Sequence, residues 1–254
     1  MFISLFVLAP FSTWCDQEWY NGENILKPMT RFDARCASQS GVDAVEGKLV
    51  LATLRSDKVI DLPCKWQASL RVDVPYGWFY CKNAKPTCAP DDHLGDVLLQ
   101  ALLITPPNHN WTWGAGLQVV FPTDGGNYYI GDAKYEVHPT LGVAYDLGEW
   151  SEGAYAGLMV RQAWSVGGYA FALPIRQTYL EPFLNINLPY QWFVNFSPEI
   201  RYNWVTHAWF VPFDVMIGKM LTKKILMSLE YDLAVIKNYP EYGQQIELRI
   251  GYFF

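Results

Sequence analysis

Apolar and polar side chains alternate one by one along most of this chain, and no other feature restricts its fold as strongly. Between residues 111 and 121 the odd positions are Trp, Trp, Ala, Leu, Val and Phe, whereas the even positions include Thr, Gly and Gln. The same two-residue period runs through 135–146 and 192–204. Successive side chains of a β-strand point to opposite faces, and a helix would not sort the residues in this way. The sequence therefore predicts strands that each have one apolar and one polar face.

Such strands recur about twelve times, and their length is unusual. They are expected at 29–36, 48–57, 65–75, 94–105, 111–121, 135–146, 155–166, 177–188, 192–204, 208–220, 224–235 and 244–254. Most have roughly 9–13 residues, whereas strands of soluble sheets usually have about five or six. A tilted strand that crosses a bilayer needs about 9–11 residues, so these lengths indicate strands that span a membrane.

The connections between the expected strands alternate in length. Short turns such as PPNHN, GEWSEG, PYQ and TKK alternate with longer loops near 76–93, 122–134, 167–176 and 236–243. Outer-membrane barrels have an even number of strands, short turns in the periplasm and longer loops outside the cell. We therefore predict an all-β fold, namely a single transmembrane antiparallel up-and-down β-barrel of about twelve strands in the bacterial outer membrane. A soluble all-β sandwich is the alternative.

Large aromatic residues end the apolar faces, as expected where rings lie at the depth of the lipid headgroups. This aromatic girdle comprises Trp66, Trp111, Trp113 and Trp192 at one set of strand ends, and Trp164, Tyr202, Trp204 and Trp209 at the other. Because the apolar faces of a membrane barrel meet lipid, its polar faces line the lumen.

Most of the polar faces carry charges in mid-strand. The residues expected to line the lumen are Arg31, Asp33, Arg35, Arg55, Arg71, Asp73, Asp96, Glu136, His138, Arg161, Glu181, Glu199, Arg201, Asp214, Glu230, Asp232, Glu247 and Arg249. Small or apolar residues interrupt them at Leu98, Leu102, Gly114, Gly116, Gly142, Phe183, Phe193 and Met216. Apolar patches between charges would suit a partly hydrophobic solute.

The composition excludes several other classes of protein. Of the 254 residues, 51% are hydrophobic and 16% aromatic, but only 17% are charged. A typical soluble domain has about 25% charged residues, and a disordered chain is poor in apolar ones. The formal net charge of −6 argues against a nucleic-acid partner, which needs a basic surface. Residues 1–15 form the one candidate membrane helix, and they fall short of the 18 or so apolar residues required.

One domain is expected, because no linker, charge block or shift in composition divides the chain after about residue 27. The barrel is assigned to residues 28–254. Residues 1–20 are interpreted as a signal-peptide remnant or a periplasmic N-terminal segment. Within them, FISLFVLAPF has the apolar character of a signal peptide, although no Lys or Arg precedes Lys27 and no clear cleavage site follows.

The cysteines and loop acids do not form a recognisable metal site. The five cysteines include no CxxC pair and lie near no histidine cluster, so neither a metal ion nor a cofactor is expected. Cys81 and Cys88 bracket a short loop and are the candidate disulfide in an oxidising compartment, with two unpaired thiols as the alternative. Asp91, Asp92 and Asp96 could attract a cation, but acidic loop residues are usually just solvated.

The chain is not expected to be an enzyme. It contains no GxSxG, HExxH or Walker motif. A hydrolase would need a nucleophile beside a histidine. His93, His109 and His207 fall in expected loops or turns, and His138 lies on a polar face beside Glu136, where hydrogen bonding is the expected role.

Four prolines fall inside expected strands, at positions 139, 182, 198 and 212. Proline has no N–H to donate to a ladder, and a closed barrel has no free edge to accommodate it. These prolines are expected to mark β-bulges, or else the strands are shorter than the alternation indicates.

From about Pro28 to Phe254 the chain resembles the outer-membrane family named for the meta-pathway of phenol degradation. The resembling stretches are KPMTRFDAR, LRVDVPYGW, HLGDVLLQALL, WTWGAGLQVVFPT, GLMVRQAWSVGG, LEPFLNINLP, QWFVNFSPEIRYNW, WFVPFDVMIGKM and ELRIGYFF. The resemblance implies a single outer-membrane barrel that transports compounds of aromatic catabolism, with no catalytic residues to carry over. The chain departs from the family in its five cysteines and its weak leader.

We therefore expect a channel or transporter for small, aromatic or hydrophobic solutes. Its expected partners are outer-membrane lipid, the solute and, through the C-terminal strand with its final aromatic residue, the barrel-assembly machinery. The alternatives are an occluded structural barrel without transport and, less favoured, an outer-membrane hydrolase.

The lumen charges leave two arrangements open. They could line a solute path, with Arg71, Arg161, Arg201 and Arg249 opposite Glu181, Glu199, Glu230 and Glu247. They could instead pair across the lumen and plug it, and many must pair in either arrangement because unpaired buried charges are costly.

Overall fold

The described part of the chain is almost entirely β-strand. The computed structural model describes residues 28–42, 47–80, 91–125, 130–239 and 241–254. Its strands are β1 (Arg31–Val42), β2 (Gly47–Asp61), β3 (Gln67–Tyr80), β4 (Asp91–Leu94), β5 (Val97–Ile104), β6 (Trp111–Phe121), β7 (Lys134–Asp146), β8 (Tyr155–Gly168), β9 (Arg176–Leu188), β10 (Trp192–Phe196), β11 (Ile200–Asn203), β12 (Ala208–Met220), β13 (Ile225–Lys237) and β14 (Gln244–Phe253). Two 3-10 turns, η1 (Pro63–Lys65) and η2 (Pro189–Gln191), join strands. No helix in these ranges has the length and apolarity to cross a membrane.

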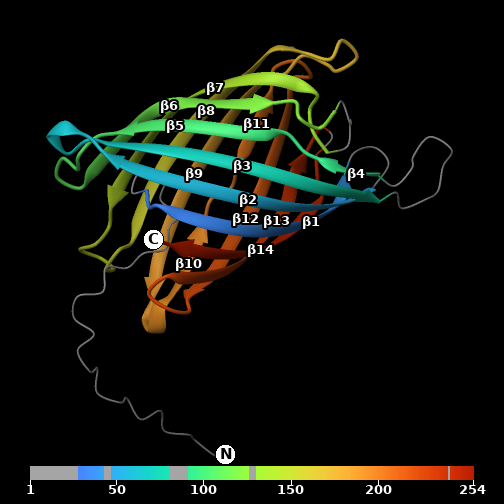
Figure 1. Ribbon diagram of the computed structural model, residues 1–254. Coiled ribbons are helices and arrows are strands. Elements are labelled where there is room, and N and C mark those ends of the chain that lie inside the picture. The colour runs from blue at the N-terminus through green and yellow to red at the C-terminus, as the bar shows by residue number, and fades with distance from the viewer. Residues whose placement is uncertain (1–27, 43–46, 81–90, 126–129, 240) are drawn as a thin grey trace, which may run out of the picture.

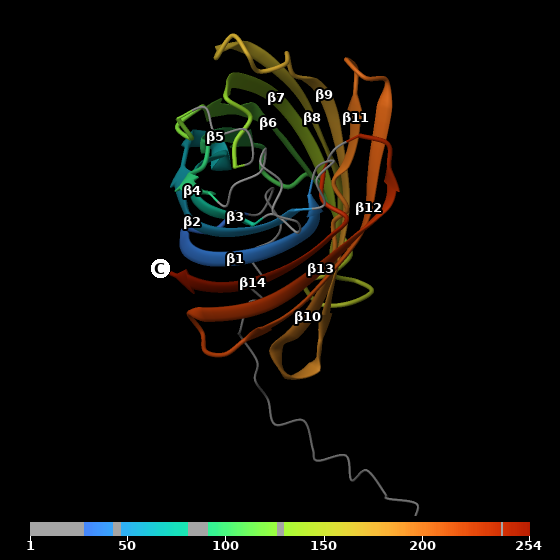
Figure 2. The same ribbon diagram turned by 90° about the vertical axis from the view of Figure 1, so that its right-hand side faces the viewer.

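Every paired strand is antiparallel to its neighbours, and the sheet closes on itself (Figures 1 and 2). β1 pairs with β14 from Arg31↔Phe253 to Ser40↔Gln244, which joins the two ends of the sheet. Two wall strands are divided: β4 and β5 both pair with β3, and β10 and β11 both lie between β9 and β12. Fourteen strand segments with two divided strands make a twelve-stranded wall. The predicted all-β antiparallel barrel is confirmed.

The prolines lie where the ladders are interrupted. Pro198 separates β10 from β11, and Pro182 lies between the parts of β9 that pair with those two strands. A register shift beside Pro212 marks a bulge against β13. The ladder between β7 and β8 has the pairs Val137↔Trp164 and Thr140↔Arg161 but none between them, so Pro139 has no paired residue on β8. Pro212 thus lies at a bulge and Pro198 in a divided strand, as predicted, whereas Pro139 and Pro182 lie inside strands of the expected length and pair on one side only.

The first residue of β1 and the last residue of β14 lie at one end of the wall, here called the short-turn end, together with the connections 62–66, 105–110, 147–154, 189–191 and 221–224. The opposite end, called the loop end, has the longer connection from β6 to β7 but also the short turn 204–207 between β11 and β12. Short turns face the periplasm in outer-membrane barrels, which gives the barrel its orientation.

Several strands extend farther toward the loop end than the alternation predicted. β1 continues to Val42 instead of ending at 36, and β3 continues to Tyr80 instead of ending at 75. The extension of β1 begins with Ala37, Ser38, Gln39 and Ser40, and the extension of β3 is YGWFY, so neither alternates between apolar and polar residues. The loop expected at 76–93 is consequently shorter, and His93 lies in β4 and not in a loop.

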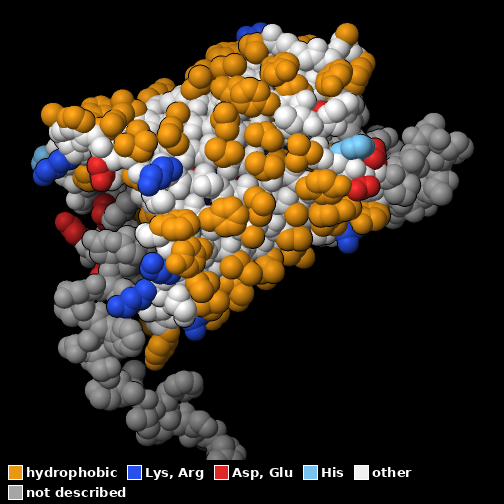
Figure 3. Space-filling view, viewed as in Figure 1, with side chains coloured by type: hydrophobic (Ala, Val, Ile, Leu, Met, Phe, Trp, Pro, Cys, Tyr) orange, Lys and Arg blue, Asp and Glu red, His pale blue; other side chains and the backbone are white. Residues whose placement is uncertain are grey.

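The outer surface of the wall is apolar (Figure 3). On β6, for example, Trp113 is 56% exposed, and Leu117 is also exposed. Large exposed apolar surfaces are unfavourable in water, whereas a closed barrel that satisfies its own backbone is one of the few structures stable in lipid. This architecture places the chain in the bacterial outer membrane.

The aromatic residues predicted for the two girdles lie at the two ends of this surface. Seven of them are exposed: Trp66, Trp111, Trp113 and Trp192 near the short-turn end, and Trp164, Trp204 and Trp209 near the loop end. The eighth, Tyr202, packs its ring 4.8 Å from that of Trp204 and 4.7 Å from that of Trp209.

Candidate functional site in the barrel interior

Polar and charged side chains cover the middle of the inner face of the wall. None of the eighteen residues predicted to line the lumen is exposed. Sixteen lie on inward positions of the wall strands, Glu199 lies in the break between β10 and β11, and Asp96 lies just before β5. Most of them gather into four groups, which are three arginine–carboxylate clusters and one group of acids.

The most deeply buried group surrounds Asp33 on β1 and is called the Asp33 cluster. The side chain of Asp33 is 0% exposed and receives three guanidinium groups, with N···O distances of 3.3 Å to Arg31, 3.9 Å to Arg35 and 3.2 Å to Arg249. Two further pairs complete the cluster: Arg31 with Asp57 at 2.7 Å, and Arg35 with Glu247 at 3.1 Å. Since β14 supplies Arg249 and Glu247, these pairs also hold the seam where the barrel closes.

A second group joins β2 to β3. Arg55 donates two parallel hydrogen bonds to the Asp73 carboxylate, at 2.8 and 2.9 Å, in the forked geometry that arginine favours. Arg71 contacts the same carboxylate through Nε at 3.0 Å. The Asp73 carboxylate therefore pairs with two arginines. The ion pair of Arg71 is with Asp73, and not with one of the glutamates that the sequence suggested.

A third group, called the Glu199 cluster, spans β8, β9, the break after β10, β11 and the β13–β14 loop. Arg161 contacts Glu181 at 3.2 Å and also pairs with Glu199. Arg201 contacts Glu199 at 2.8 Å and Glu241 at 2.9 Å. The arrangement of Arg161 and Arg201 opposite Glu181 and Glu199 agrees with the predicted one.

An aromatic ring lies under the Glu199 cluster. The guanidinium groups of Arg161 and Arg201 lie 5.1 and 5.5 Å from the centre of the Tyr179 ring, within the range of cation–π attraction. His138 stacks on Tyr179 with ring centres 5.9 Å apart and lies 2.8 Å from Glu136. His138 thus has the hydrogen-bonding environment that was expected for it.

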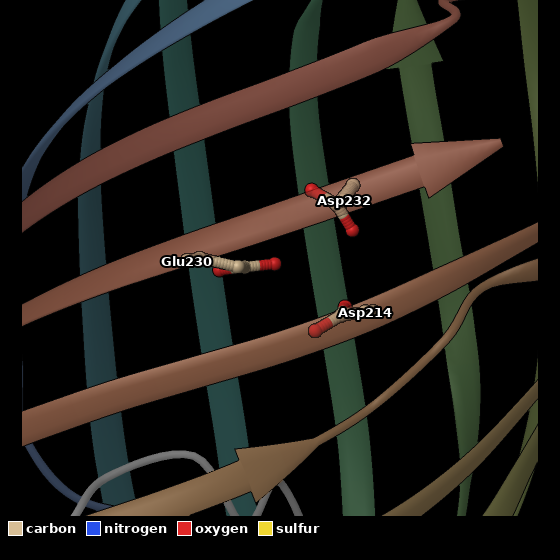
Figure 4. Close-up of side chains that lie close together, drawn as sticks. All are labelled: Asp214, Glu230 and Asp232. Carbon is tan, nitrogen blue, oxygen red and sulfur yellow. The ribbon is translucent and has the colours of Figure 1, made fainter.

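Carboxylates converge on the wall formed by β12 and β13. Ligand oxygens of Asp214, Glu230 and Asp232 lie within 4.8 Å of one another, and Figure 4 shows the three side chains turned toward a common point. Glu230 makes no ion pair among the described residues, although the charge of Arg35 lies near enough to act on it. The neighbouring strands bring Asp214 and Glu247 to its sides, while Arg249 reaches Asp33 instead.

Apolar clusters occupy the interior toward both ends. The loop end holds Leu49, Phe79, Ile130, Phe210, Tyr239 and Tyr242. The short-turn end holds one cluster of Leu102, Ile104, Ala144, Tyr155, Met159 and Phe183, and another of Phe193, Met216, Met220, Leu226 and Phe253 with Met29 against it. A solute that crossed this interior would meet apolar, then charged, then apolar walls.

Sequence reasoning missed four interior residues that matter. Asp57 continues the inward series of β2 by one step and could have been found by extending the alternation. Gln118, hydrogen-bonded to His138 at 3.1 Å, and Tyr179 were on the polar faces but carry no charge. Glu241 lies in a loop, where no periodicity could predict that it meets Arg201.

The candidate disulfide and the N-terminal segment lie outside the described residues. Cys81, Cys88 and residues 1–20 all belong to ranges that the structure leaves undescribed. Of the cysteines in the described ranges, Cys36 and Cys64 are free and exposed.

Asp96 fastens a loop at the loop end, outside the strands. Its carboxylate accepts the backbone N–H of Asp132 at 2.7 Å and that of Asp124 at 3.4 Å. Burial raises the pKa of Asp96 to about 7, and the neighbouring carboxylates of Asp124 and Asp132 contribute to the same shift.

The stability of the fold is expected to fall as the pH rises through 7. An acid with a raised pKa in the folded state holds its proton more tightly there than in the unfolded chain, where its pKa is about 3.9. The stabilisation is therefore complete below about pH 4 and is lost as the carboxyl ionises near pH 7. The ionised carboxylate accepts the Asp132 N–H more strongly, so the loss is expected in the stability of the whole fold and not in that hydrogen bond. The unfolding midpoint in urea should fall as the pH rises from about 5 to about 8. Asp96→Asn should abolish this fall, and the same pH dependence in both proteins would contradict the prediction.

No protein-family model matches the chain, and no curated protein matches it. Solved structures resemble it over most of its length. The COG4313 outer membrane channel from Pseudomonas putida F1 superposes with a TM-score of 0.69 at 17% identity, covering 89% of this chain and 94% of that one. The NanC porin gives 0.60 at 14% identity (88% and 98% covered), and the KdgM porin 0.55 at 9% (88% and 99%). At these identities the likeness shows the fold, which is that of outer-membrane channels and porins.

Proposed function

We propose that this chain forms a channel for small solutes across the bacterial outer membrane. The observation that carries the proposal is that charged side chains inside the barrel keep contact with water. In the Glu199 cluster the side chain of Glu199 is 29% exposed, whereas that of Asp33 is fully buried. Water-accessible charges within a closed wall are what an aqueous path requires.

The proposed solute is small and aromatic or partly hydrophobic. Tyr179 in the middle, and Phe210, Tyr239 and Tyr242 toward the loop end, offer rings beside the charged groups. The resemblance to the family named for the meta-pathway of phenol degradation favours the same class, and membership of that family is part of the proposal. In liposome swelling, we expect benzoate to enter faster than a neutral sugar of similar size.

Two surface roles belong to the same proposal. The exposed aromatic residues at both ends of the wall would hold the barrel at headgroup depth. β14, which closes the barrel against β1, would be the segment that the barrel-assembly machinery binds.

An occluded barrel is the competing function, since apolar clusters occupy both ends of the interior. Planar-bilayer recording of the folded chain separates the two functions. A channel should give discrete openings, and Arg201→Ala should shift selectivity toward cations by about twofold or more, because Glu241 and Glu199 lose a positive partner.

The matched control is Arg176→Ala. Arg176 lies at the start of β9 on the outer face, with its guanidinium 5.7 Å from the centre of the Trp204 ring. Its loss should leave selectivity unchanged. A folded wild-type chain that never opens would favour the occluded barrel, and unchanged selectivity with lower stability in Arg201→Ala would assign Arg201 to structural pairing.

A further inference from the structure

Three carboxylates inside the barrel lie together and have no arginine or lysine as an ion-pair partner among the described residues: Asp214, Glu230 and Asp232. Most other inward acids contact an arginine, namely Asp33, Asp57, Asp73, Glu181, Glu199, Glu241 and Glu247. Glu136 contacts His138 instead, at 2.8 Å. The arginines nearest in register through β14 are Arg249 and Arg35, and both are engaged with Asp33.

The three side chains come from two adjacent strands and point toward one another. Asp214↔Asp232 and Met216↔Glu230 are paired positions of β12 and β13, so the carboxylates occupy neighbouring rungs of one ladder. Their ligand oxygens lie within 4.8 Å of one another (Figure 4). Like charges held this close repel each other unless something positive lies between them.

One buried oxygen at this place lacks a partner. Asp214 is 5% exposed, and its Oδ1 accepts no hydrogen bond although the side chain is turned toward the other two acids. Buried polar atoms nearly always bind something, so an unpartnered oxygen turned into a group of acids points to a ligand between them.

We propose that Asp214, Glu230 and Asp232 bind one calcium ion on the inner wall of the barrel. Carboxylate oxygens are the ligands of hard divalent cations. Ligand oxygens within 4.8 Å of one another can all reach one such cation. Ca²⁺ is proposed because it accepts irregular sets of carboxylate oxygens, whereas Mg²⁺ requires a nearly ideal octahedron and keeps several of its waters. Gln245 donates to Asp232 Oδ2 at 2.9 Å and would orient that ligand, as second partners of metal ligands commonly do.

The bound ion would neutralise the acidic wall of the interior without involving the Glu199 cluster. The inference does not depend on an open lumen, because an occluded barrel could hold the same ion. Failure of conduction and failure of calcium binding are therefore separate results.

Calorimetric titration of the metal-stripped, lipopolysaccharide-free full chain in detergent tests the site, with CaCl₂ and MgCl₂ as titrants. We expect one Ca²⁺ per chain and weaker binding of Mg²⁺. Asp214→Asn and Glu230→Gln should each lower the affinity for Ca²⁺ by about tenfold or more. Heat-modifiable gel migration checks that each variant is folded, and either variant alone suffices if the other fails to fold.

Glu181→Gln is the matched control. It removes an inward carboxylate that already has an arginine, so the affinity for Ca²⁺ should change by less than about twofold. An absence of Ca²⁺ binding at millimolar concentration would overturn the proposal. An equal loss of affinity in Glu181→Gln and Asp214→Asn would also overturn it, because the ion would then respond to the overall charge of the interior.

Discussion

Replacing Asp33 by asparagine is expected to destabilise the folded barrel by about 3–5 kcal/mol, the usual cost of removing one partner from a buried ion pair. The Asp33 side chain is fully buried and lies within 3.9 Å of the guanidinium groups of Arg31, Arg35 and Arg249. The amide would keep the shape of the side chain but leave three positive charges close together with less compensation. Because Arg249 belongs to β14, the seam between β1 and β14 should open first.

Urea titration in detergent, followed by heat-modifiable gel migration and tryptophan fluorescence, measures this effect. Asp61→Asn is the control. Asp61 is exposed at the short-turn end of β2 and accepts one hydrogen bond from Gln67 at 3.1 Å, so its loss should cost less than about 1 kcal/mol. Equal unfolding midpoints for the two variants would mean that the Asp33 cluster contributes no net stability.

The wall could be predicted from the sequence because alternation is local information. Each strand shows by itself which side chains meet lipid and which point inward, so the charged residues and the apolar Phe193 and Met216 could all be assigned to the inner face. Strand ends could be predicted only where one face is apolar. The alternation fades after residue 36 in β1, although the strand continues to Val42.

Partners inside the barrel could not be predicted, because they depend on register between strands that are distant in the sequence. Asp33 and Arg249 are 216 residues apart and meet through the closing pair of strands. A shift of two residues in that register would bring Arg249 or Glu247 beside a different group. The same information decides that Glu230 lies beside two acids and makes no ion pair with an arginine among the described residues, so the proposed calcium site was invisible in the sequence.

Closely spaced backbones are a second feature that the sequence could not reveal. Gly116, on the inner face of β6, was identified only as a small residue among polar ones. In the structure it pairs with Leu102 of β5. A Cβ at position 116 would lie 2.0 Å from the carbonyl oxygen of Ala101 and 2.8 Å from the Cα of Leu102.

Gly116→Ala is therefore expected to destabilise the barrel by about 3 kcal/mol or more, at the upper end of what overpacking costs. The closest atom, the Ala101 oxygen, and the Leu102 Cα are both backbone. Rotation of the Leu102 side chain, whose Cδ2 would lie at 2.7 Å, therefore cannot make room for the methyl group, and β5 and β6 must separate. In urea titration the unfolding midpoint should fall, and a larger share of the chain should fail to fold.

Gly167→Ala, in β8, is the control for the loss of glycine itself. A Cβ there would have as its nearest neighbour the Cδ2 of Tyr135 at 3.7 Å, an ordinary van der Waals contact. The free energy of unfolding should change by no more than about 1 kcal/mol. The new methyl group fits in the folded barrel, and it lowers the conformational entropy of the unfolded chain. If Gly116→Ala were as stable as Gly167→Ala, β5 and β6 could move apart at this point without a loss of stability. The backbones of the two strands would then be less tightly packed than their hydrogen-bonded pairing implies. The large difference expected between the two variants follows from which atoms surround each glycine, since the substitution is chemically the same.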